Sequence, residues 1–282
     1  MNRRTFLTRA SLSVAASAVG CFAFATEIEP HRLEIVERDL AIEKLPLALN
    51  GTRLAQLSDL HIGPQVSDEY IVHTFDRLRA LAPDFIVITG DFLTYRRARG
   101  EAQFAQLRNV LAHLPRGRLA TLGILGNHDY GRGWGDLAFA NRVAAEAERA
   151  GVRMLRNESR AVSGLDFVGV EDLWSHRGDP VAALRARESD AAIVLVHNPD
   201  AADQQPWPDF RGWMLAGHTH GGQCKPPFLP PPLLPVQNRR YVAGEVRVDA
   251  DRTLYISRGV GHLIRARFNV RPEMTLFTLR SA

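Results

Sequence analysis

The sequence predicts an α/β protein of one domain, with two stacked mixed sheets, helices on the outside and the functional side chains along one edge. Three observations lead to this prediction. Buried apolar runs alternate three times with helical segments in the first half, which favours parallel strands covered by helices. From residue 152 the runs become short strands with tight turns, which suggests antiparallel pairing. Polar side chains that can bind metal follow several of these strands, where an open α/β sheet places its site.

The first half supplies the repeated strand and helix units. Residues 33–42 alternate apolar and polar side chains, and the runs at 52–57, 85–89 and 119–125 have the composition of buried strands. The helix after the second strand shows apolar residues at helical spacing from Ile71 to Leu78; Asp68 can cap it and Pro83 ends it. Two further helices are expected, at 101–114 and at 137–150.

The second half contains shorter segments. Strands are expected at 152–156, 160–163, 165–170, 193–196 and 213–216, with a helix near 180–187 between them. Residues 241–279 are expected to form three more strands. No internal repeat or linker divides the chain, so residues 26–282 are predicted to be one domain.

Residues 1–25 have the pattern of an export signal rather than of a folded element. Arg3 and Arg4 form a twin-arginine pair, an apolar stretch follows, and Ala23-Phe24-Ala25 matches an A-x-A cleavage site. We therefore expect export of a folded, metal-loaded protein to the periplasm or to the outer face of the cytoplasmic membrane. A retained membrane anchor and lipid modification at Cys21 stay open as alternatives.

Removal of this segment changes the charge balance. The segment contains three arginines and no acid, so cleavage lowers Lys+Arg from 35 to 32 against 31 Asp+Glu. The nearly neutral remainder is not a general polyanion binder, and it lacks a nucleic-acid groove with interleaved aromatic side chains. It retains a single cysteine, Cys224, which excludes an internal disulfide.

Seven side chains at or just beyond the ends of apolar strands are candidate metal ligands. They are Asp59, His61, Asp91, Asn127, His197, His218 and His220. Carboxylate, imidazole and amide donors together suit borderline divalent ions such as Mn, Fe, Zn or Co. Seven donors exceed what one catalytic ion with an open position requires, and they suit two ions about 3.5–4 Å apart that share a carboxylate.

These residues stand in five ordered motifs. The motifs are Asp59-x-His61, Gly90-Asp91, Gly126-Asn127-His128-Asp129, the single His197, and Gly217-His218-x-His220. Together they resemble the motifs of the calcineurin-like metallophosphoesterases over residues 52–222. The resemblance implies that family's four-layered β-sandwich of two mixed sheets flanked by helices.

The resemblance also implies a role for each residue. Asp59, His61 and His220 would hold one ion, Asn127, His197 and His218 the other, and Asp91 would bridge them. A metal-activated hydroxide would attack phosphorus. His128 would assist the leaving group, and Asp129 would orient the other ring nitrogen of His128. Many members of this family carry an acidic residue at the position of Thr94. This difference limits the subgroups of the family to which the chain can belong.

The segment 226–235 contains six prolines and four large apolar residues, so it can form neither a helix nor a central strand. It is expected near the rim of the site, either as a packed loop or as an apolar ledge that touches a bilayer or an acyl chain. Arg239, Arg240, Arg258 and Arg265 are candidates for phosphate contact. Trp134 and Trp174 are expected in the core.

The predicted function is therefore that of a dinuclear metal-dependent phosphodiesterase or pyrophosphatase, with a lipid-linked or nucleotide phosphate as substrate. If the protein is an enzyme, the alternative function is that of a soluble phosphomonoesterase. If the protein is not an enzyme, the alternative is a metal-binding scaffold without catalysis. The oligomeric state and the metal identity stay open.

Overall fold

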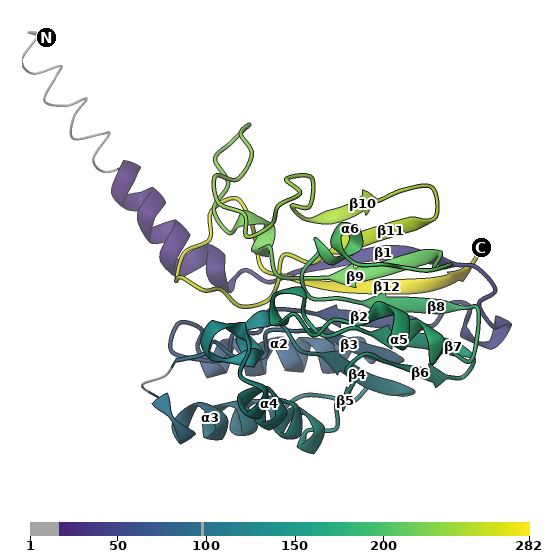
Figure 1. Ribbon diagram of the computed structural model, residues 1–282. Coiled ribbons are helices and arrows are strands. Elements are labelled where there is room, and N and C mark those ends of the chain that lie inside the picture. Colours follow the sequence, from purple (N-terminus) through teal and green to yellow (C-terminus); the bar gives the residue numbers. More distant parts are fainter. Residues whose placement is uncertain (1–16, 97–98) are drawn as a thin grey trace, which may run out of the picture.

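Two six-stranded sheets form the centre of the protein and lie face to face (Figure 1). The fold is described from a computed structural model, which places residues 17–96 and 99–282. Helices cover the outer face of each sheet, which gives four layers (Figure 1). The α/β class with two mixed sheets flanked by helices is thereby confirmed.

The first sheet contains both ends of the folded chain. In spatial order its strands are β1 (Glu34–Ile42), β12 (Glu273–Ser281), β2 (Arg53–Leu57), β3 (Phe85–Thr89), β4 (Ala120–Ile124) and β5 (Arg153–Met154). The C-terminal β12 lies parallel to β1 and antiparallel to β2, and β2 to β5 are all parallel. The carboxyl ends of β2, β3 and β4 therefore meet at one edge.

The second sheet is also mixed. Its order is β10 (Gly244–Arg247), β11 (Arg252–Ile256), β9 (Gly212–Ala216), β8 (Ala192–Leu195), β7 (Leu165–Gly169) and β6 (Glu158–Val162). Strands β11, β9, β8 and β7 run parallel, and the two edge strands are antiparallel to their neighbours. Antiparallel pairing was predicted for the short strands at 152–156, 160–163 and 165–170. That prediction is wrong for β5, which joins the first sheet parallel to β4, and holds for β6 with β7.

The helices pack on the outer faces. The longer ones are α2 (Asp68–Leu81), α3 (Glu101–Leu111) and α4 (Leu137–Arg149), and the second sheet carries α5 (Pro180–Arg185) and α6 (Ala201–Gln204). The side chain of Ser67, rather than the expected Asp68, caps α2 by accepting the N–H of Tyr70 at 3.2 Å. Ala82 ends α2 in the left-handed conformation.

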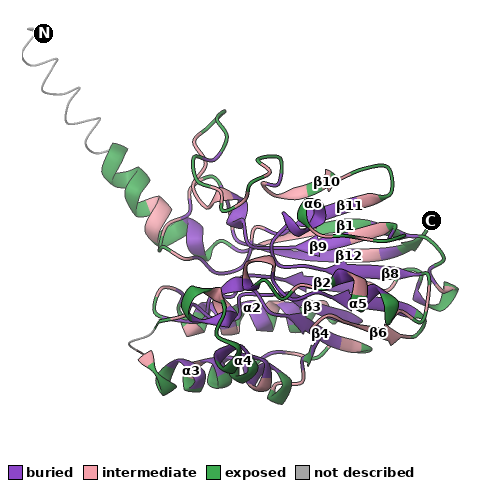
Figure 2. Ribbon diagram, viewed as in Figure 1, coloured by how far each residue is buried: buried purple, intermediate pink, exposed green. Residues whose placement is uncertain are grey.

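Successive side chains of a strand point to opposite faces of the sheet and therefore enter two different apolar layers. In β3, Phe85 and Val87 point between the two sheets, whereas Ile86 and Ile88 point toward the helices. All four are fully buried, and Figure 2 shows the central strands buried while the outer helices expose one face. Gln56 connects the layers near the site, because its Nε2 donates to Ala216 O of β9 at 2.9 Å. This packing fixes the two sheets relative to each other at the edge where the strands end.

Residues 17–31 form a helical segment that leads into β1. It comprises a helix at 17–23, a π-helical turn at Phe24–Ile28 and a 3-10 turn at Glu29–His31. The segment contacts the body of the protein, since Ala25 O accepts the N–H of Arg267 at 2.8 Å. The twin-arginine pair lies outside the described residues. Within the described ranges, no helix combines the length and the apolar character needed to cross a membrane.

Candidate metal centre

The seven candidate ligands lie together at the carboxyl edge of the two sheets. Asp59 and His61 follow β2, Asp91 follows β3, Asn127 begins the turn after β4, His197 follows β8, and His218 and His220 follow β9. All seven are buried, with exposed fractions between 0% and 5%. Parallel strands in two stacked sheets thus bring together side chains from position 59 to position 220 of the chain.

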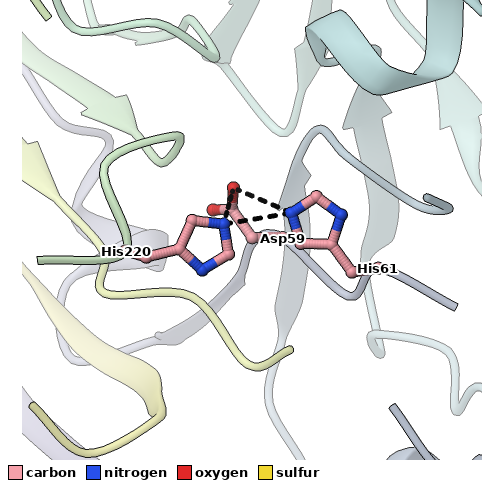
Figure 3. A group of neighbouring side chains, drawn as sticks. All are labelled: Asp59, His61 and His220. Carbon is pink, nitrogen blue, oxygen red and sulfur yellow. Dashed lines mark hydrogen bonds and ion pairs between the residues drawn. The ribbon is translucent and has the colours of Figure 1, made fainter. Parts of the chain in front are cut away.

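Asp59, His61 and His220 form the first group (Figure 3). Nε2 of His61 lies 3.0 Å from Nε2 of His220, which lies 3.3 Å from Oδ1 of Asp59. The two imidazole rings are stacked, with centroids 4.9 Å apart and planes 19° from parallel. The donor atoms therefore point at a common centre.

Asn127, His197 and His218 form a second group next to the first. Nε2 of His197 lies 3.2 Å from Oδ1 of Asn127 and 3.2 Å from Nδ1 of His218. Asp59, Asp91 and His197 also offer atoms within 4.8 Å of one another. The two groups are therefore adjacent parts of one cluster.

Asp91 lies between the two groups. Its Oδ2 is 3.5 Å from Nε2 of His61 in the first group and 3.3 Å from Nε2 of His197 in the second. Its Oδ1 accepts the backbone N–H of His128 at 2.9 Å, which orients the carboxylate. The carboxylate is placed to be shared by two cations.

Contacts on the far side of three rings fix which nitrogen faces the cluster. Nδ1 of His197 lies 2.8 Å from Thr89 O, and Nε2 of His218 lies 2.9 Å from Pro235 O. Because a carbonyl only accepts, these nitrogens carry protons, and the other ring nitrogens, Nε2 of His197 and Nδ1 of His218, face inward. Nδ1 of His61 lies 3.0 Å from Oγ1 of Thr94. Thr94 thus holds the ring of His61.

The backbone at the site is strained. Asp59, His61, Asp91, His218 and His220 have φ between 48° and 71°, the left-handed region that side chains other than glycine seldom adopt. Such residues cost about 1–3 kcal/mol each and concentrate at functional sites. Gly90 has φ +94, and a Cβ there would lie 2.7 Å from Nδ1 of His197, so only glycine permits this approach.

Burial dominates the electrostatics of the cluster. It raises the pKa of Asp59 to about 6 and lowers the pKa of His218 to about 3. Burial also lowers the pKa of His61 and of His220 well below the usual value. Burial opposes charge on Asp91 and His197 too, but their mutual attraction holds the pKa of Asp91 well below and that of His197 well above the ordinary range.

This donor set fits two divalent cations. Three of the four imidazoles favour the neutral form, whose lone pair can bind a metal. Two carboxylates buried in a low dielectric need positive charge for balance. A mixture of carboxylate, imidazole and amide oxygen without thiolate suits Mn, Fe, Zn or Co.

His128 lies beside the cluster, with its ring edge-on to His61 at a centroid distance of 5.0 Å. The prediction that Asp129 orients its second nitrogen is wrong. Asp129 accepts the backbone N–H groups of Gly126, Phe92 and Leu93 instead, and Nδ1 of His128 is buried without a hydrogen-bond partner among the described residues. The two residues are neighbours in the 3-10 turn Asn127–Tyr130, where consecutive side chains point in different directions. Asp129 ties the turn after β4 to the loop after β3.

The four arginines predicted to contact phosphate bind protein groups instead. Arg258 pairs with Glu273 and Glu34, and Arg265 pairs with Glu27 at 2.5 Å. Arg239 donates to Pro231 O at 2.9 Å and Arg240 to Arg247 O at 3.0 Å. Their role toward substrate stays a prediction.

Three residues near the ligands did not stand out in the sequence. Arg267 is fully buried; its Nη2 donates to Arg258 O at 2.9 Å and to Gly259 O at 3.1 Å, and lies 3.4 Å from Nδ1 of His220. It therefore braces the loop behind Asp59, and no local pattern announces that. Trp134 and Trp174, expected in the core, are half-buried and contact His128 and His218. The glycines around Trp134 were the available sign of an unusual loop.

Two stacked mixed sheets with a buried cluster able to hold two divalent cations indicate a dinuclear metal enzyme. The sequence model of the calcineurin-like phosphoesterases matches residues 52–222. Phosphodiesterase YaeI of Escherichia coli is 31% identical over 287 residues, covering 99% of each chain. The uncharacterised metallophosphoesterase YkuE of Bacillus subtilis is 32% identical, covering 100% of this chain and 98% of its own. UDP-2,3-diacylglucosamine pyrophosphatase LpxG of Chlamydia trachomatis is 25% identical, covering 96% of each.

The chain belongs to the calcineurin-like phosphoesterase family. It is a hydrolase that uses two divalent metal ions.

Proposed function

We propose that the protein is an exported phosphodiesterase or pyrophosphatase whose substrate is a lipid-linked or nucleotide phosphate. Two relatives that match over nearly their full length support a phosphodiester or pyrophosphate bond as the one cleaved. One is named as a phosphodiesterase, and the other as a pyrophosphatase of UDP-2,3-diacylglucosamine. The observation that carries the proposal is the position of Asp91 Oδ2, 3.5 Å from His61 Nε2 and 3.3 Å from His197 Nε2.

In this proposal Asp59, His61 and His220 hold one ion, Asn127, His197 and His218 hold the other, and Asp91 serves both. When bound, two such ions lower the pKa of a water and neutralise phosphate charge. The protein supplies fixed geometry, since the rings of His61, His197 and His218 are each held from behind by a hydrogen bond.

His128 is proposed to protonate the leaving oxygen. It stands beside the first group without being part of either. A buried nitrogen without a protein partner calls for an explanation. The imidazole beside the phosphate site is available for proton transfer rather than for structure.

The apolar segment 226–235 supports the lipid-linked part of the proposal. It reaches the site, because Pro235 O lies 2.9 Å from Nε2 of His218. Phe228, Leu229 and Leu233 are 104%, 59% and 78% exposed. A groove beside this segment is lined by Gly221, which follows His220 in the sequence, and by Phe228, Leu229, Pro231, Val242 and Val270. Such a groove suits an acyl chain that approaches from a membrane.

Two neighbouring segments continue this apolar surface. Ile264 is 61% exposed, and Ile28 of the N-terminal helical segment is 50% exposed. The ion pair between Arg265 and Glu27 joins these two segments, and Gln223 Nε2 donates to Ile264 O at 3.0 Å. We propose that this side of the molecule makes peripheral contact with the membrane.

Export by the twin-arginine route, with a signal over residues 1–25, is part of the same proposal. A substrate at a membrane surface fits a protein delivered to the periplasm or to the outer face of the cytoplasmic membrane. Replacing Arg3 and Arg4 by lysine is expected to keep the protein in the cytoplasm. Fractionation of cells that make each form checks this, and equal export of both forms would contradict it.

The direct test compares hydrolysis of bis(p-nitrophenyl) phosphate with that of p-nitrophenyl phosphate in the presence of Mn²⁺. Faster hydrolysis of the diester is expected. Preference for the monoester would favour the phosphomonoesterase alternative. Stoichiometric metal with no hydrolysis of either would favour the scaffold without catalysis.

A further inference from the structure

Two tryptophans stand beside the metal centre on the side of His128 and His218. The ring of Trp134 lies 4.7 Å from that of His128, and the ring of Trp174 lies edge-on to His218 at 4.6 Å. The two indole centroids are 6.4 Å apart, with planes 33° from parallel. Both side chains are half-buried, so they line the approach to the cluster rather than the core.

These tryptophans differ from the other two in the chain. The indole N–H of Trp207 donates to Ala201 O, and that of Trp213 donates to Ala41 O, both within 2.9 Å. Among the described residues, the indole N–H groups of Trp134 and Trp174 have no such acceptor. Tryptophan N–H groups usually find a partner where the ring is part of the packing. Within the described part of the chain, the pair therefore has two donors without a protein acceptor beside the metal centre.

The backbone holds both rings in place. Asp172 Oδ1 accepts the N–H of Trp174 at 2.9 Å, at the start of the turn Leu173–Ser175. Trp134 stands between Gly133 and Gly135 and has φ 60°, in the left-handed region that is costly for a large side chain. A bulky residue held in this conformation at a site mouth indicates that its position matters.

We propose that Trp134 and Trp174 form a binding site for a nucleobase carried on one ester arm of the phosphate substrate. This inference rests on the proposed function and specifies one half of the substrate. A base can stack on the indoles, and its ring nitrogens or carbonyl oxygens can accept the two free N–H groups. An acyl chain could pack on the flat faces but would leave both N–H donors without an acceptor.

The other ester arm of the proposed substrate would lie on a different surface of the protein. Trp174 and Pro235 both contact His218, from different directions: Trp174 with its ring and Pro235 with its carbonyl oxygen. The aromatic pair and the apolar segment 226–235 thus meet at one metal ligand. A substrate with a nucleoside on one side of the phosphate and a lipid on the other would occupy both surfaces at once.

The test is calorimetric titration of the Mn²⁺-loaded protein with uridine 5′-monophosphate and, separately, with ribose 5-phosphate. The two ligands share phosphate and ribose and differ only in the base. The wild type is expected to bind the nucleotide about tenfold or more tightly than the sugar phosphate, as for one base stacked on an aromatic side chain. Replacing both tryptophans by alanine is expected to bring this ratio close to one and leave ribose 5-phosphate binding unchanged.

Conservative and remote variants control the result. Phenylalanine at 134 and 174 is expected to keep the part of the preference that comes from stacking and to lose the part that comes from the N–H groups, whereas Trp213→Phe should keep all of it. Indole fluorescence of the wild type should be quenched by the nucleotide and not by the sugar phosphate, which tests the site even if the alanine variants do not fold. A wild-type ratio of one, or a ratio that survives the double alanine change, would overturn the inference. Loss of diester hydrolysis in the wild type would instead overturn the proposed function.

Discussion

Oδ2 of Asp91 lies 3.3 Å from Nε2 of His197, and both groups are buried. The same oxygen lies 3.5 Å from Nε2 of His61, which belongs to the other ligand group. One carboxylate thus connects a histidine that follows a strand of the first sheet with a histidine that follows a strand of the second. The cluster depends on the alignment of the two sheets, which Gln56 helps to maintain through Ala216.

Asp91→Asn is expected to lower metal content and activity together. The amide keeps the shape but removes the charge that two cations would share, so both ions lose a ligand. A fall in metal affinity of more than about 100-fold is expected, above the range for residues that only support a ligand. Elemental analysis and hydrolysis of bis(p-nitrophenyl) phosphate measure both quantities, with Asp190→Asn at the exposed pair with Lys44 as control. Full metal content in Asp91→Asn would refute the bridging role.

His128→Ala should separate binding from turnover. Its ring lies beside the cluster, so both ions are expected to stay while kcat falls by about 10²–10⁴-fold, the usual contribution of a general acid. Metal content and kcat are measured on the same sample. If the variant loses both ions, His128 is a ligand and its assignment as proton donor is wrong.

Thr94→Val is expected to weaken metal binding without unfolding the protein. Valine has nearly the shape of threonine but cannot bond Nδ1 of His61, which lies 3.0 Å from Oγ1. Loss of such a supporting contact typically costs about 10–100-fold in metal affinity. Titration with Mn²⁺ measures the change, and Thr94→Ser, which keeps a hydroxyl, should restore most of it. Equal affinity in the valine and serine variants would show that the hydroxyl has no part in holding His61.

Much of the fold followed from periodicity. Alternation in β1, the continuous apolar run of β3 and helical spacing in α2 predicted these elements within a few residues, because each pattern reports which faces are buried. Pairing was harder to predict. Nothing local to β12 shows that it inserts between β1 and β2, and β5 is only two residues long, so it carries almost no pattern.

The residues of the site likewise divide into those that a local sequence pattern predicts and those that it does not. Residues that end strands, such as Asp59 and His197, were predictable because parallel strands end at one edge. Contacts made by distant loops were not, which is why Asp129 was assigned to His128 and the two tryptophans to the core. Arg267 reaches His220 from a loop 47 positions away, and spacing alone does not reveal such a contact.

The apolar segment 226–235 leads to a prediction about membranes. Replacing Phe228 and Leu233 by serine should lower binding to vesicles that contain anionic lipid by about tenfold or more, since burying either side chain is worth roughly 1.5–3 kcal/mol. Flotation of protein with vesicles measures the bound fraction. Leu47→Ser is the matched control, because Leu47 is 85% exposed but belongs to the turn Leu47–Leu49, outside this surface. Equal losses in both variants would argue against a specific membrane face.

Glu146 provides a prediction about pH. A hydrogen bond from Arg108 is the main cause that lowers the pKa of this carboxyl from 4.5 to about 2. Burial opposes this change, and a second hydrogen bond, from Arg149, adds to it. Because the folded pKa is the lower one, the stabilisation is complete above about pH 4.5 and is lost as the pH falls toward 2. Glu146→Gln should cost about 1–2 kcal/mol at pH 7, discounted for the exposure of both arginines, and much less near pH 3.

Urea unfolding of metal-free protein at the two pH values measures this difference. Glu101→Gln is the control: Glu101 also joins α3 to α4, through Arg142, but its side chain is 80% exposed and its loss should change stability little. A cost for Glu146→Gln that does not shrink at low pH would show that the carboxylate charge is not its source.

The central claim is that this cluster holds two metal ions. Anomalous diffraction from crystals grown with Mn²⁺ tests it most directly. We predict two peaks about 3.5–4 Å apart, one among Asp59, His61 and His220 and one among Asn127, His197 and His218, with Asp91 between them. A single peak, or peaks away from these side chains, would contradict it.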